Sequence, residues 1–550
     1  MVPSESAIPY VVEQGEKRLR VLATAGRRPG KELLRRWELD KFSGKELTQA
    51  MGYGVAIEYG WEGELRVWAD IGGFYPAYYW SNGEVMVCAS SPTFADCHED
   101  FRRKVDTFGI VTQLTLGHGG LGRTLWEGVR QMRPCHELQW RRGSEAKEEA
   151  LDWYSTKIAY RDVGEAAQAF GEELEKSTQL WGGRQACLML SGGIDSRLMA
   201  GALRKNWGTN YRAITLGSEE DQEYKIASQV ARHLGVAQKR VEVPLEKYDE
   251  WMDLQLESCQ GTSGVTNFAN WAVGECGELD KISLVSGLVG EQIMGGRIAH
   301  DVWNAQTGVA DVQILMQRMV RFGLAVGMQE RLLRIKGAQE MRESIEQAIL
   351  RDFERYEGAP FQKAIRLSTE YRLRHHSGRE AWRWGQAALP RLPFLDPEVQ
   401  RIGAQMPYVC TVDREVQKRL LIDKYPDLAR LPLDRNSLFI RPLLVDGLGA
   451  KLRWAMQQRL YIKKNVRKLS GKEEFRYYYR VYSLNYHPGW IRLRDRARSV
   501  ARKFSDIFDP EVVEKLIPAG AQDVEEGTSI VESAGRKVLI GQLLWLEKFA

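Results

Sequence analysis

The chain has 550 residues, 43% of them hydrophobic, so it is long enough to bury cores in two or three packed domains. No apolar run reaches the roughly 18 residues that span a bilayer, and the N-terminal residues lack the basic flank and apolar core of a signal peptide. The net charge of +5 is too small for this length to indicate nucleic-acid binding, and the seven cysteines form no CxxC pair, which argues against a disulfide framework and a zinc knuckle. We therefore expect a globular cytoplasmic protein with reduced cysteines.

Residues 1–155 are expected to form a first, β-rich domain. Apolar and aromatic side chains alternate with polar ones there, and Gly or Asn-Gly separates the runs. This pattern predicts short strands at residues 54–60, 64–70, 77–80 and 84–90. Residues 101–113 are a candidate helix.

Residues 156–550 are expected to form a second domain of the α/β class. Short apolar runs at 187–190, 211–218, 238–244 and 281–287 alternate with helical patterns at 166–179, 197–204 and 221–234. Such alternation predicts a parallel sheet with helices on its faces, and ligands bind such sheets at the carboxyl ends of the strands. From about residue 310 onward the sequence predicts mainly helices, for example at 312–323 and 338–356.

One segment, Ser191-Gly-Gly-Ile-Asp-Ser196, follows the first apolar run of the second domain and leads into a helix. Adjacent glycines allow a ligand to approach the backbone, and the serine hydroxyls and the helix start supply hydrogen-bond donors, which suits a phosphate. Asp195 would repel a phosphate unless a divalent cation lay between them. The segment matches neither GxxxxGK[ST] nor GxGxxG. The alternative is an ordinary strand-to-helix turn with an N-cap.

Five motifs occur in a recognisable order. They are Asp70-Ile-Gly-Gly-Phe-Tyr-Pro-Ala-Tyr-Tyr79, Arg123-Thr-Leu-Trp-Glu-Gly-Val-Arg-Gln-Met-Arg-Pro134, Ser191-Gly-Gly-Ile-Asp-Ser196, Val285-Ser-Gly287 with Gly295-Gly296, and Arg391-Leu-Pro-Phe-Leu-Asp396. Together they resemble the asparagine synthetase superfamily. The resemblance implies an Ntn-type β-rich α+β sandwich of the class II glutamine amidotransferase type, followed by a PP-loop (ATP pyrophosphatase) domain with a helical C-terminal extension.

The resemblance also implies a reaction and its cofactors, ATP and Mg²⁺. Such enzymes transfer AMP to a carboxylate with release of pyrophosphate, and an amine then attacks the acyl-adenylate to give an amide. Asp195 would act in catalysis and would hold magnesium together with Glu291. Leu190 and Leu216 would face adenine, although both also fit an ordinary sheet core. The nucleotide-binding set as a whole would be Leu190, Ser191, Gly192, Gly193, Ile194, Asp195, Ser196, Leu216, Ser286 and Gly287.

The catalytic lysine of the family has no direct counterpart in this sequence, because Asn436 or Ser437 stands at its place. Arg435, Arg441 or Lys418 would then supply the positive charge, and sequence alone does not choose among the three. For each of them, an ordinary surface charge is the competing interpretation.

Three further residues depart from the family pattern. Position 2 is Val2 where the amidotransferase half carries its nucleophilic cysteine, and no cysteine occurs before Cys88, so we expect no release of ammonia from glutamine. Leu288 and Leu389 occupy the places of a tyrosine and a glutamate that deprotonate the attacking nitrogen in β-lactam-forming relatives. A leucine accepts no proton, so an amine that needs little help from a base is favoured.

These departures favour an amidotransferase-inactive branch that resembles the lasso peptide cyclases and β-lactam synthetases. A free α-amine with a pKa near 8 is partly unprotonated at cellular pH, which fits macrolactam formation in a lasso-type peptide. The expected partners are a peptide or small-molecule carboxylate, a precursor peptide and its leader peptidase, without a membrane or nucleic acid. The alternatives are an ammonia-dependent asparagine synthetase or other small-molecule amide or β-lactam ligase, and a nucleotide-binding pseudoenzyme.

The sequence does not decide the role of two charged stretches. Residues 372–380 combine arginines, histidines and a glutamate on one predicted helix, which favours a solvated helix over a site for substrate carboxylate or phosphate. Residues 451–503 hold 16 Lys or Arg against three acids and are interleaved with aromatic residues. This composition favours a solvated helix face. The alternative is that the stretch binds an acidic leader peptide or carrier protein.

Overall fold

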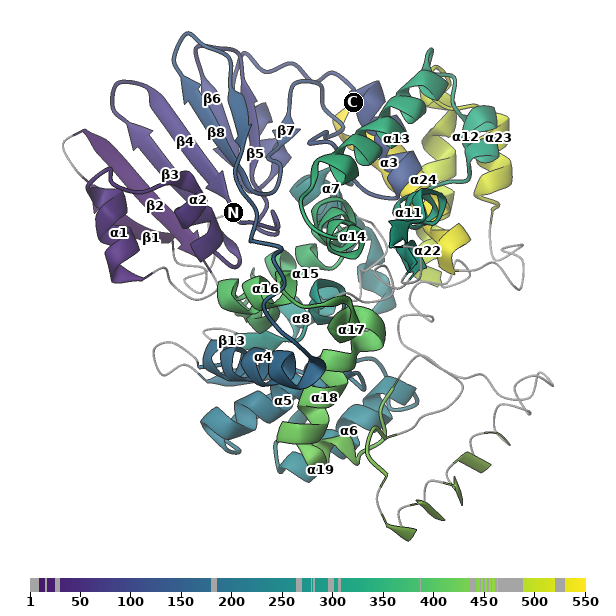
Figure 1. Cartoon of the computed structure of the whole chain (residues 1–550). Helices are drawn as coiled ribbons and strands as arrows, with labels where there is room; N and C mark the ends of the chain where they lie inside the picture. Colours follow the sequence, from purple (N-terminus) through teal and green to yellow (C-terminus); the bar gives the residue numbers. More distant parts are fainter. Residues whose placement is uncertain are drawn as a thin grey trace.

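The computed structural model (Figure 1) describes residues 9–14, 17–24, 30–179, 185–263, 270–277, 279, 282–294, 301–304, 308–385, 387–434, 442–445, 447–448, 451–452, 455–456, 458–459, 462, 488–519 and 530–550. The fold is mixed α/β, with antiparallel sheets in the N-terminal part and a parallel sheet in the part that follows. Within the described residues, no helix has the length and apolar character needed to cross a membrane.

The N-terminal part contains two antiparallel sheets. The larger has the order β1-β2-β3-β4-β8-β9, with β1 (Pro9–Gln14), β2 (Arg18–Thr24), β3 (Gly54–Gly60), β4 (Glu64–Ala69), β8 (His136–Arg141) and β9 (Lys147–Ala150). The smaller has the order β6-β5-β7, with β5 (Tyr78–Ser81), β6 (Met86–Ala89) and β7 (Arg130–Gln131). The four strands that the sequence predicts here are all present, β3 with the predicted bounds.

The two sheets pack face to face. Val67 and Leu138 of the larger sheet are fully buried against a cluster that includes Tyr79 and Cys88 of the smaller one. The outer face of the larger sheet is covered by α1 (Lys31–Glu38) and α2 (Gly44–Ala50), which bury Trp68 with their own apolar side chains. The β-rich sandwich that the family resemblance implies is therefore confirmed, and it contains the four strands that the alternating pattern predicts.

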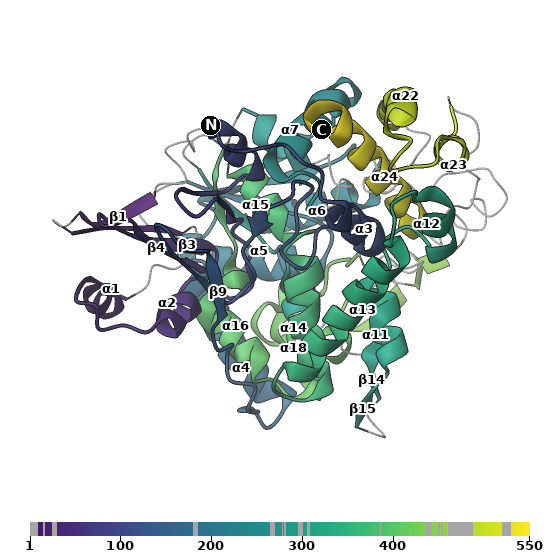
Figure 2. The same cartoon turned by 90° about the horizontal axis from the view of Figure 1, so that it is seen from above.

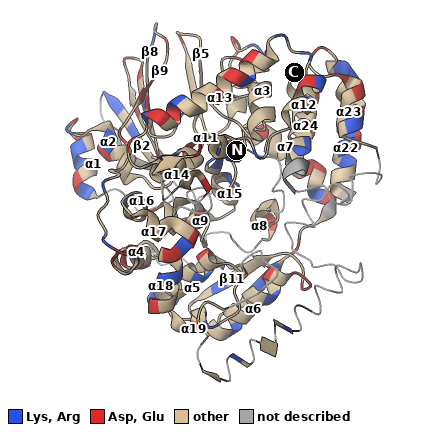
Figure 3. Cartoon of the chain, turned by 45° about the vertical axis from the view of Figure 1, so that its right-hand side comes forward, with Lys and Arg blue, Asp and Glu red and all other residues tan. Residues whose placement is uncertain are grey.

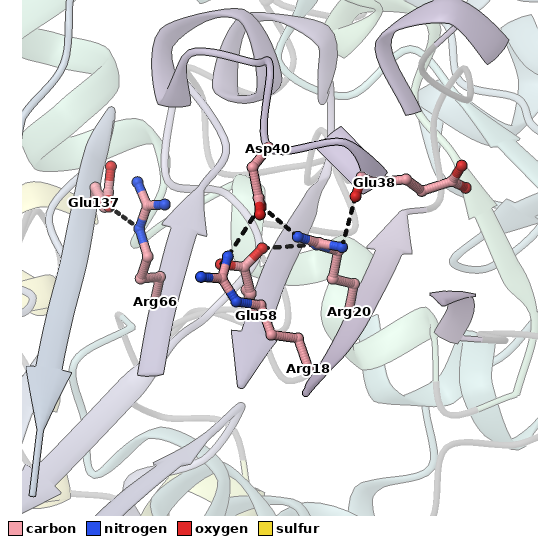
Figure 4. A network of polar contacts seen from close by, with 7 residues as sticks. All are labelled: Arg18, Arg20, Glu38, Asp40, Glu58, Arg66 and Glu137. Atoms are coloured by element: carbon pink, nitrogen blue, oxygen red, sulfur yellow. Dashed lines mark hydrogen bonds and ion pairs between the residues drawn. The ribbon is translucent and has the colours of Figure 1, made fainter. Parts of the chain in front are cut away.

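A polar network fixes the α1–α2 connection to the larger sheet (Figure 4). Arg20 Nε donates to Glu58 Oε2 at 2.7 Å, and each side chain is only 4% exposed. Arg20 Nη2 and Arg18 Nη1 both donate to Asp40 Oδ1, at 2.5 and 2.9 Å. A buried charge of this kind is tolerated only when it is paired, so the pair locks the connection to β2 and β3.

The second part is built on a five-stranded parallel sheet with the order β12-β11-β10-β13-β16. The strands are β10 (Ala186–Met189), β11 (Tyr211–Leu216), β12 (Gln238–Val241), β13 (Ser283–Ser286) and β16 (Leu389–Arg391). The helices α5 (Ile194–Trp207) and α6 (Gln222–Leu234) pack against it, and α4 (Val163–Ser177) packs against α5. Four strands were expected from the sequence. The fifth, β16, is short and contains Pro390, so it carries no strand pattern.

Helices make up most of the remaining chain. They are α3 (Thr107–Leu116), α7 (Tyr248–Cys259), α8 (Trp271–Glu275), α9 (Gly290–Ile293), α11 (Val312–Met319), α12 (Val326–Leu332), α13 (Ala338–Arg355), α14 (Pro360–Ser368), α15 (Gly378–Trp384), α16 (Pro397–Ala404), α17 (Tyr408–Thr411), α18 (Glu415–Lys424), α19 (Pro426–Ala429), α22 (Pro488–Ala501), α23 (Pro510–Leu516) and α24 (Ile530–Phe549), with a small hairpin of β14 (Trp303–Asn304) and β15 (Val309–Ala310). The helix expected at 101–113 begins later because the Asp106 side chain caps it by accepting from Gly109 N.

Helix α24, near the C-terminus, packs against the N-terminal part of the chain. Trp126 Nε1 donates to Phe549 O at 3.3 Å, and Gln542 Nε2 donates to Ile110 O at 3.0 Å. Seen from above, α24 lies beside α3 and α7 (Figure 2). One apolar core therefore contains residues from the N-terminal part, the parallel sheet and α24.

The prediction of a solvated helix at residues 372–380 is wrong. Arg374, His375 and Arg379 are 4%, 3% and 3% exposed. Arg374 Nη1 donates to Met132 O at 2.9 Å, and Arg379 Nη2 donates to the Tyr78 hydroxyl at 2.9 Å. The charged side chains are buried because backbone and hydroxyl oxygens of the N-terminal part accept their hydrogen bonds.

The basic stretch 451–503 is described only in part, and its residues 463–487 lie outside the described residues. Its C-terminal end contains α22, which carries four arginines, Arg492, Arg494, Arg496 and Arg498 (Figure 3). Arg492 pairs with Asp249 of α7, and Arg496 pairs with Asp253 of α7 and Glu547 of α24. These arginines serve packing between helices.

Candidate active site

The predicted phosphate loop, residues 191–196, lies at the carboxyl end of β10, the central strand of the parallel sheet. The hydroxyls of Ser191 and Ser196 are 2.9 Å apart, and the Ser196 hydroxyl accepts from Ser191 N at 3.1 Å. Gly193 N donates to the Ser191 hydroxyl at 3.2 Å, and α5 begins at Ile194. The two serine hydroxyls therefore stabilise the turn by hydrogen bonds within it, and α5 starts directly at the end of β10.

Glycine is required at two positions around this loop. Gly287 follows β13, whose Ser286 is paired in parallel register with Met189 of β10. A Cβ on Gly287 would lie 2.7 Å from the carbonyl carbon of Asp195, and one on Gly192 would lie 2.8 Å from the Cβ of Asp434. The 191–196 loop is thus held between two backbone segments that leave no room for a side chain.

A cavity of about 330 Å³ opens beside the loop. Its lining includes the predicted residues Leu190, Ser191, Asp195, Ser196, Leu216, Ser286, Gly287 and Glu291. Gly192, Gly193 and Ile194 form the turn but do not line the cavity, and Ile194 belongs to the core. Sequence reasoning missed the lining residues Thr215, Glu223, Asn270, Ser377, Glu380 and Trp384.

The two predicted magnesium carboxylates meet at one arginine. Arg414 Nη2 donates to Asp195 Oδ1, and Arg414 Nη1 lies 3.8 Å from Glu291 Oε2. Gln417 Nε2 donates to the same Asp195 oxygen at 2.6 Å. One guanidinium therefore bridges carboxylates from α5 and α9.

Arg414 is held there by unusual backbone geometry. It precedes α18 and has φ 64°, and Asp413 before it has φ 50°. A left-handed conformation costs a side-chain-bearing residue about 1–2 kcal/mol. The contacts of Arg414 with Asp195, Glu291 and Gln417 offset that cost.

The carboxylates fit magnesium by their chemistry. Mg²⁺ prefers hard oxygen ligands and commonly takes one or two carboxylates plus substrate phosphates. No cluster of three or more His, Cys, Asp or Glu side chains with metal-binding geometry occurs among the described residues. Asp195 and Glu291 would therefore need oxygens from a substrate to complete a coordination shell, and a metal bound there would compete with Arg414.

Glu223 of α6 adds a third carboxyl group to the cavity wall. Burial, together with the neighbouring carboxylates of Asp434 and Asp221, raises the pKa of Glu223 to about 8. At neutral pH this side chain is mostly protonated. It therefore adds little negative charge to a cavity that would hold phosphates.

Helix α15 forms another wall of the cavity. Glu380 pairs with Arg383 at 2.6 Å, and both side chains are buried. Trp384 is 2% exposed, and its Nε1 is buried with no hydrogen-bond partner in the described part of the chain. This indole N–H is a donor that a bound ligand can use.

The candidates for the missing family lysine are only partly described. Arg435 and Arg441 lie outside the described residues. Lys418 Nζ donates to Asp413 Oδ2 at 2.7 Å and to Glu415 Oε1 at 2.8 Å. Neither Lys418 nor Arg414 lines the cavity, but Arg414 contacts the cavity carboxylates Asp195 and Glu291. Arg414 is the cation that sequence reasoning missed. The one pattern in the sequence that could have pointed to Arg414 is that it lies three residues before Gln417, the other residue that donates to Asp195.

A buried arginine supports the loop from behind. Arg197 is fully buried and donates to the carbonyl oxygens of Leu428, Leu431 and Pro432. Burial lowers the pKa of Arg197 to about 9. The chain that it holds continues to Asp434, whose N–H donates to Gly192 O at 2.9 Å. Arg197 thereby sets the position of the 191–196 loop.

Comparison with known families bears on this same region. Residues 169–257 match the family model for asparagine synthase. The matched stretch contains β10, the 191–196 loop, α5 and most of α7, so it includes Asp195 but not Glu291 or Arg414. It supports an ATP-dependent, amide-forming ligase at the level of that family. No curated protein matches the sequence.

Proposed function

We propose that this protein is an AMP-forming ligase that adenylates a substrate carboxylate and joins it to an amine. The observation that carries the proposal is the meeting of Asp195 and Glu291 beside the 191–196 loop, at the carboxyl ends of β10 and β13. A loop that suits a phosphate and two carboxylates that suit magnesium are the two parts that pyrophosphate release from ATP requires.

The residues take separate roles in this proposal. Backbone N–H groups at the start of α5 bind the leaving pyrophosphate, and Leu190 and Leu216 lie against adenine. Asp195 and Glu291 would hold magnesium, which supplies positive charge to the phosphates as the α–β bond breaks. Protonated Glu223 reduces repulsion of the triphosphate in the same cavity.

The amine is proposed to come from the substrate. The first cysteine of the sequence, Cys88, lies on β6, and burial raises the pKa of its thiol to about 12, so it is a poor nucleophile. Leu288 lines the cavity and cannot accept a proton. An α-amine with a pKa near 8 needs the least help from a base, which favours macrolactam formation in a lasso-type peptide.

One observation favours a second candidate function. Because Arg414 already neutralises Asp195 and Glu291, the protein could bind a nucleotide in this cavity without turning it over. That alternative is a nucleotide-binding pseudoenzyme, and it differs from the ligase in having no need for magnesium.

Pyrophosphate release tests the ligase. The protein is incubated with ATP, magnesium and a panel of peptides that have a free N-terminal amine and an internal Asp or Glu. We expect substrate-dependent pyrophosphate release that Asp195→Asn lowers at least about a hundredfold, since it removes a charge that stabilises the transition state. Asp423→Asn, which changes an exposed carboxylate of α18, is the matched control and should retain full activity. Full turnover by Asp195→Asn would refute the assigned role.

A further inference from the structure

A second cavity, of about 410 Å³, lies between the N-terminal part and the parallel-sheet part. Residues near the ends of β2, β3 and β5 line one side, and α7, α8 and α15 line the other. It shares no lining residue with the candidate nucleotide cavity. Helix α15 separates the two, because Glu380 and Trp384 face the nucleotide cavity whereas Ala381 and Trp382 face the second one. In Figure 1, α15 and α8 lie between the antiparallel sheets and the parallel sheet.

Five aromatic side chains contribute to the walls of this second cavity. Tyr53, Tyr75, Phe94, Trp271 and Trp382 all line it, and the rings of Tyr53 and Tyr75 meet edge to face at 5.5 Å. Aromatic faces bind apolar side chains and stack on peptide groups. A volume of this size accommodates a ligand of a few residues rather than a single water or ion.

Hydrogen-bonding groups in these walls lack protein partners. Tyr53 is 3% exposed, yet neither its hydroxyl nor that of Tyr75 makes a hydrogen bond to any residue that the structure describes. Trp271 is 7% exposed, and its Nε1 is likewise without a partner in the described ranges. Burial raises the pKa of both tyrosines, so the hydroxyls stay protonated and can donate. Buried polar groups are normally paired, so the buried Trp271 N–H is expected to find a partner from outside the chain, and the two tyrosine hydroxyls, which open to the same cavity, can bind the same ligand.

The charges around the cavity are already paired. Glu257 Oε1 accepts from Lys548 at 2.6 Å, Glu275 Oε1 accepts from Trp251 Nε1 at 2.7 Å, and Arg383 pairs with Glu380 at 2.6 Å. Among the described residues, Glu257, Glu275 and Arg383 are the only charged side chains that line the second cavity. The ligand is therefore expected to carry hydrogen-bonding groups but no net charge.

We propose that this cavity binds an apolar, uncharged segment of the peptide substrate, whose backbone carbonyls accept hydrogen bonds from Tyr53 and Tyr75. The inference rests on the proposed function, since it assigns a peptide as the substrate. A segment held here lies on the far side of α15 from the nucleotide, which leaves the reacting carboxylate outside this cavity. The N-terminal part would then select substrates without taking part in the chemistry.

Calorimetric titration with N-acetyl-Phe-Leu-amide, a neutral capped dipeptide, tests the proposal in the full-length protein without ATP. We expect saturable binding that the double variant Tyr53→Phe and Tyr75→Phe weakens at least about tenfold, because two hydrogen bonds are lost. Tyr59→Phe, which changes a tyrosine of β3 that does not line the cavity, is the matched control and should bind like the unmodified protein. Unchanged affinity in the double variant would overturn the proposal.

A cavity-filling variant tests the proposed peptide site independently. Gly274 lines the cavity, and a Cβ there would lie 3.9 Å or more from its nearest neighbours, so Gly274→Leu fills space without a clash at Cβ. It should abolish dipeptide binding and leave the unfolding temperature unchanged or higher. Dipeptide binding that survives in Gly274→Leu, that ATP displaces, or that is absent in the unmodified protein would overturn the proposal. Pyrophosphate release is measured separately, so failure of this site and failure of the ligase reaction remain distinguishable.

Discussion

Arg414 is expected to compete with divalent cations for Asp195 and Glu291. Replacing it by Gln removes the charge but keeps a Cβ, so the left-handed backbone at this position is equally strained before and after the change. Arg414 Nη1 and Glu291 Oε2 are 3.8 Å apart, a distance at which two unit charges attract by about 1 kcal/mol in water and about 4 kcal/mol at intermediate dielectric. Their side chains are 21% and 43% exposed, so solvent screening reduces this attraction to about 1 kcal/mol.

A contribution of similar size from Asp195 gives a total of about 2 kcal/mol, which corresponds to roughly 30-fold in affinity. We therefore expect Arg414→Gln to bind Mn²⁺, used as a spectroscopic substitute for Mg²⁺, about 5- to 30-fold more tightly in the absence of ATP. Electron paramagnetic resonance of free Mn²⁺ measures this directly. Arg419→Gln, which changes an exposed arginine of the following helix α18, should leave the affinity unchanged. Equal or weaker Mn²⁺ binding in Arg414→Gln would show that the guanidinium does not occupy the cation site.

Three further predictions follow from particular contacts. Gly287→Ala should destroy ATP binding, measured by calorimetry, because its Cβ would meet the backbone of Asp195 at 2.7 Å; unaltered affinity would contradict the packing of the loop. Glu58→Gln should lower the free energy of unfolding by about 1–3 kcal/mol in denaturant titrations, since it removes one of the two carboxylates that pair with buried Arg20, and an unchanged free energy would argue against a buried pair. The raised pKa of Glu223 means that the folded state binds a proton more tightly than the unfolded state does. The contribution of Glu223 to stability is therefore present below pH 4.5 and is lost as the pH rises toward 8. Glu223→Gln should flatten that part of the pH–stability profile.

Local pattern was enough to predict much of the fold. The alternation in residues 54–60 gives β3 with its observed bounds, and the apolar runs of the second part give β10, β11, β12 and β13, because these strands are bounded by clear turn signals. Ser191, Asp195 and Gly287 each follow an expected strand of the parallel sheet, and that position predicts that they lie at the same edge of the sheet, where they line one cavity. In each case the information lies within a few residues of chain.

What could not be predicted depends on contacts between distant parts of the chain. Arg414 reaches Asp195 across 219 positions, and its orientation depends on two left-handed residues that have no glycine to mark them. Residues 372–380 have the composition of a solvated helix, but Arg374 and Arg379 are buried, and Met132, Tyr78 and Ser258 supply their acceptors. The second cavity is formed by Tyr53 and Trp271, which come from different parts of the fold, and neither residue belongs to a motif.

The central claim is that ATP is cleaved between its α- and β-phosphates to activate a carboxylate. Chromatography of the nucleotide products formed from α-labelled ATP, with magnesium and a peptide that carries both a free amine and an acidic side chain, tests it most directly. The account predicts AMP in amounts equal to the peptide that loses one water, with no AMP when Asp195 is replaced by Asn. Formation of ADP, or peptide-independent hydrolysis that persists in the Asp195→Asn variant, would contradict it.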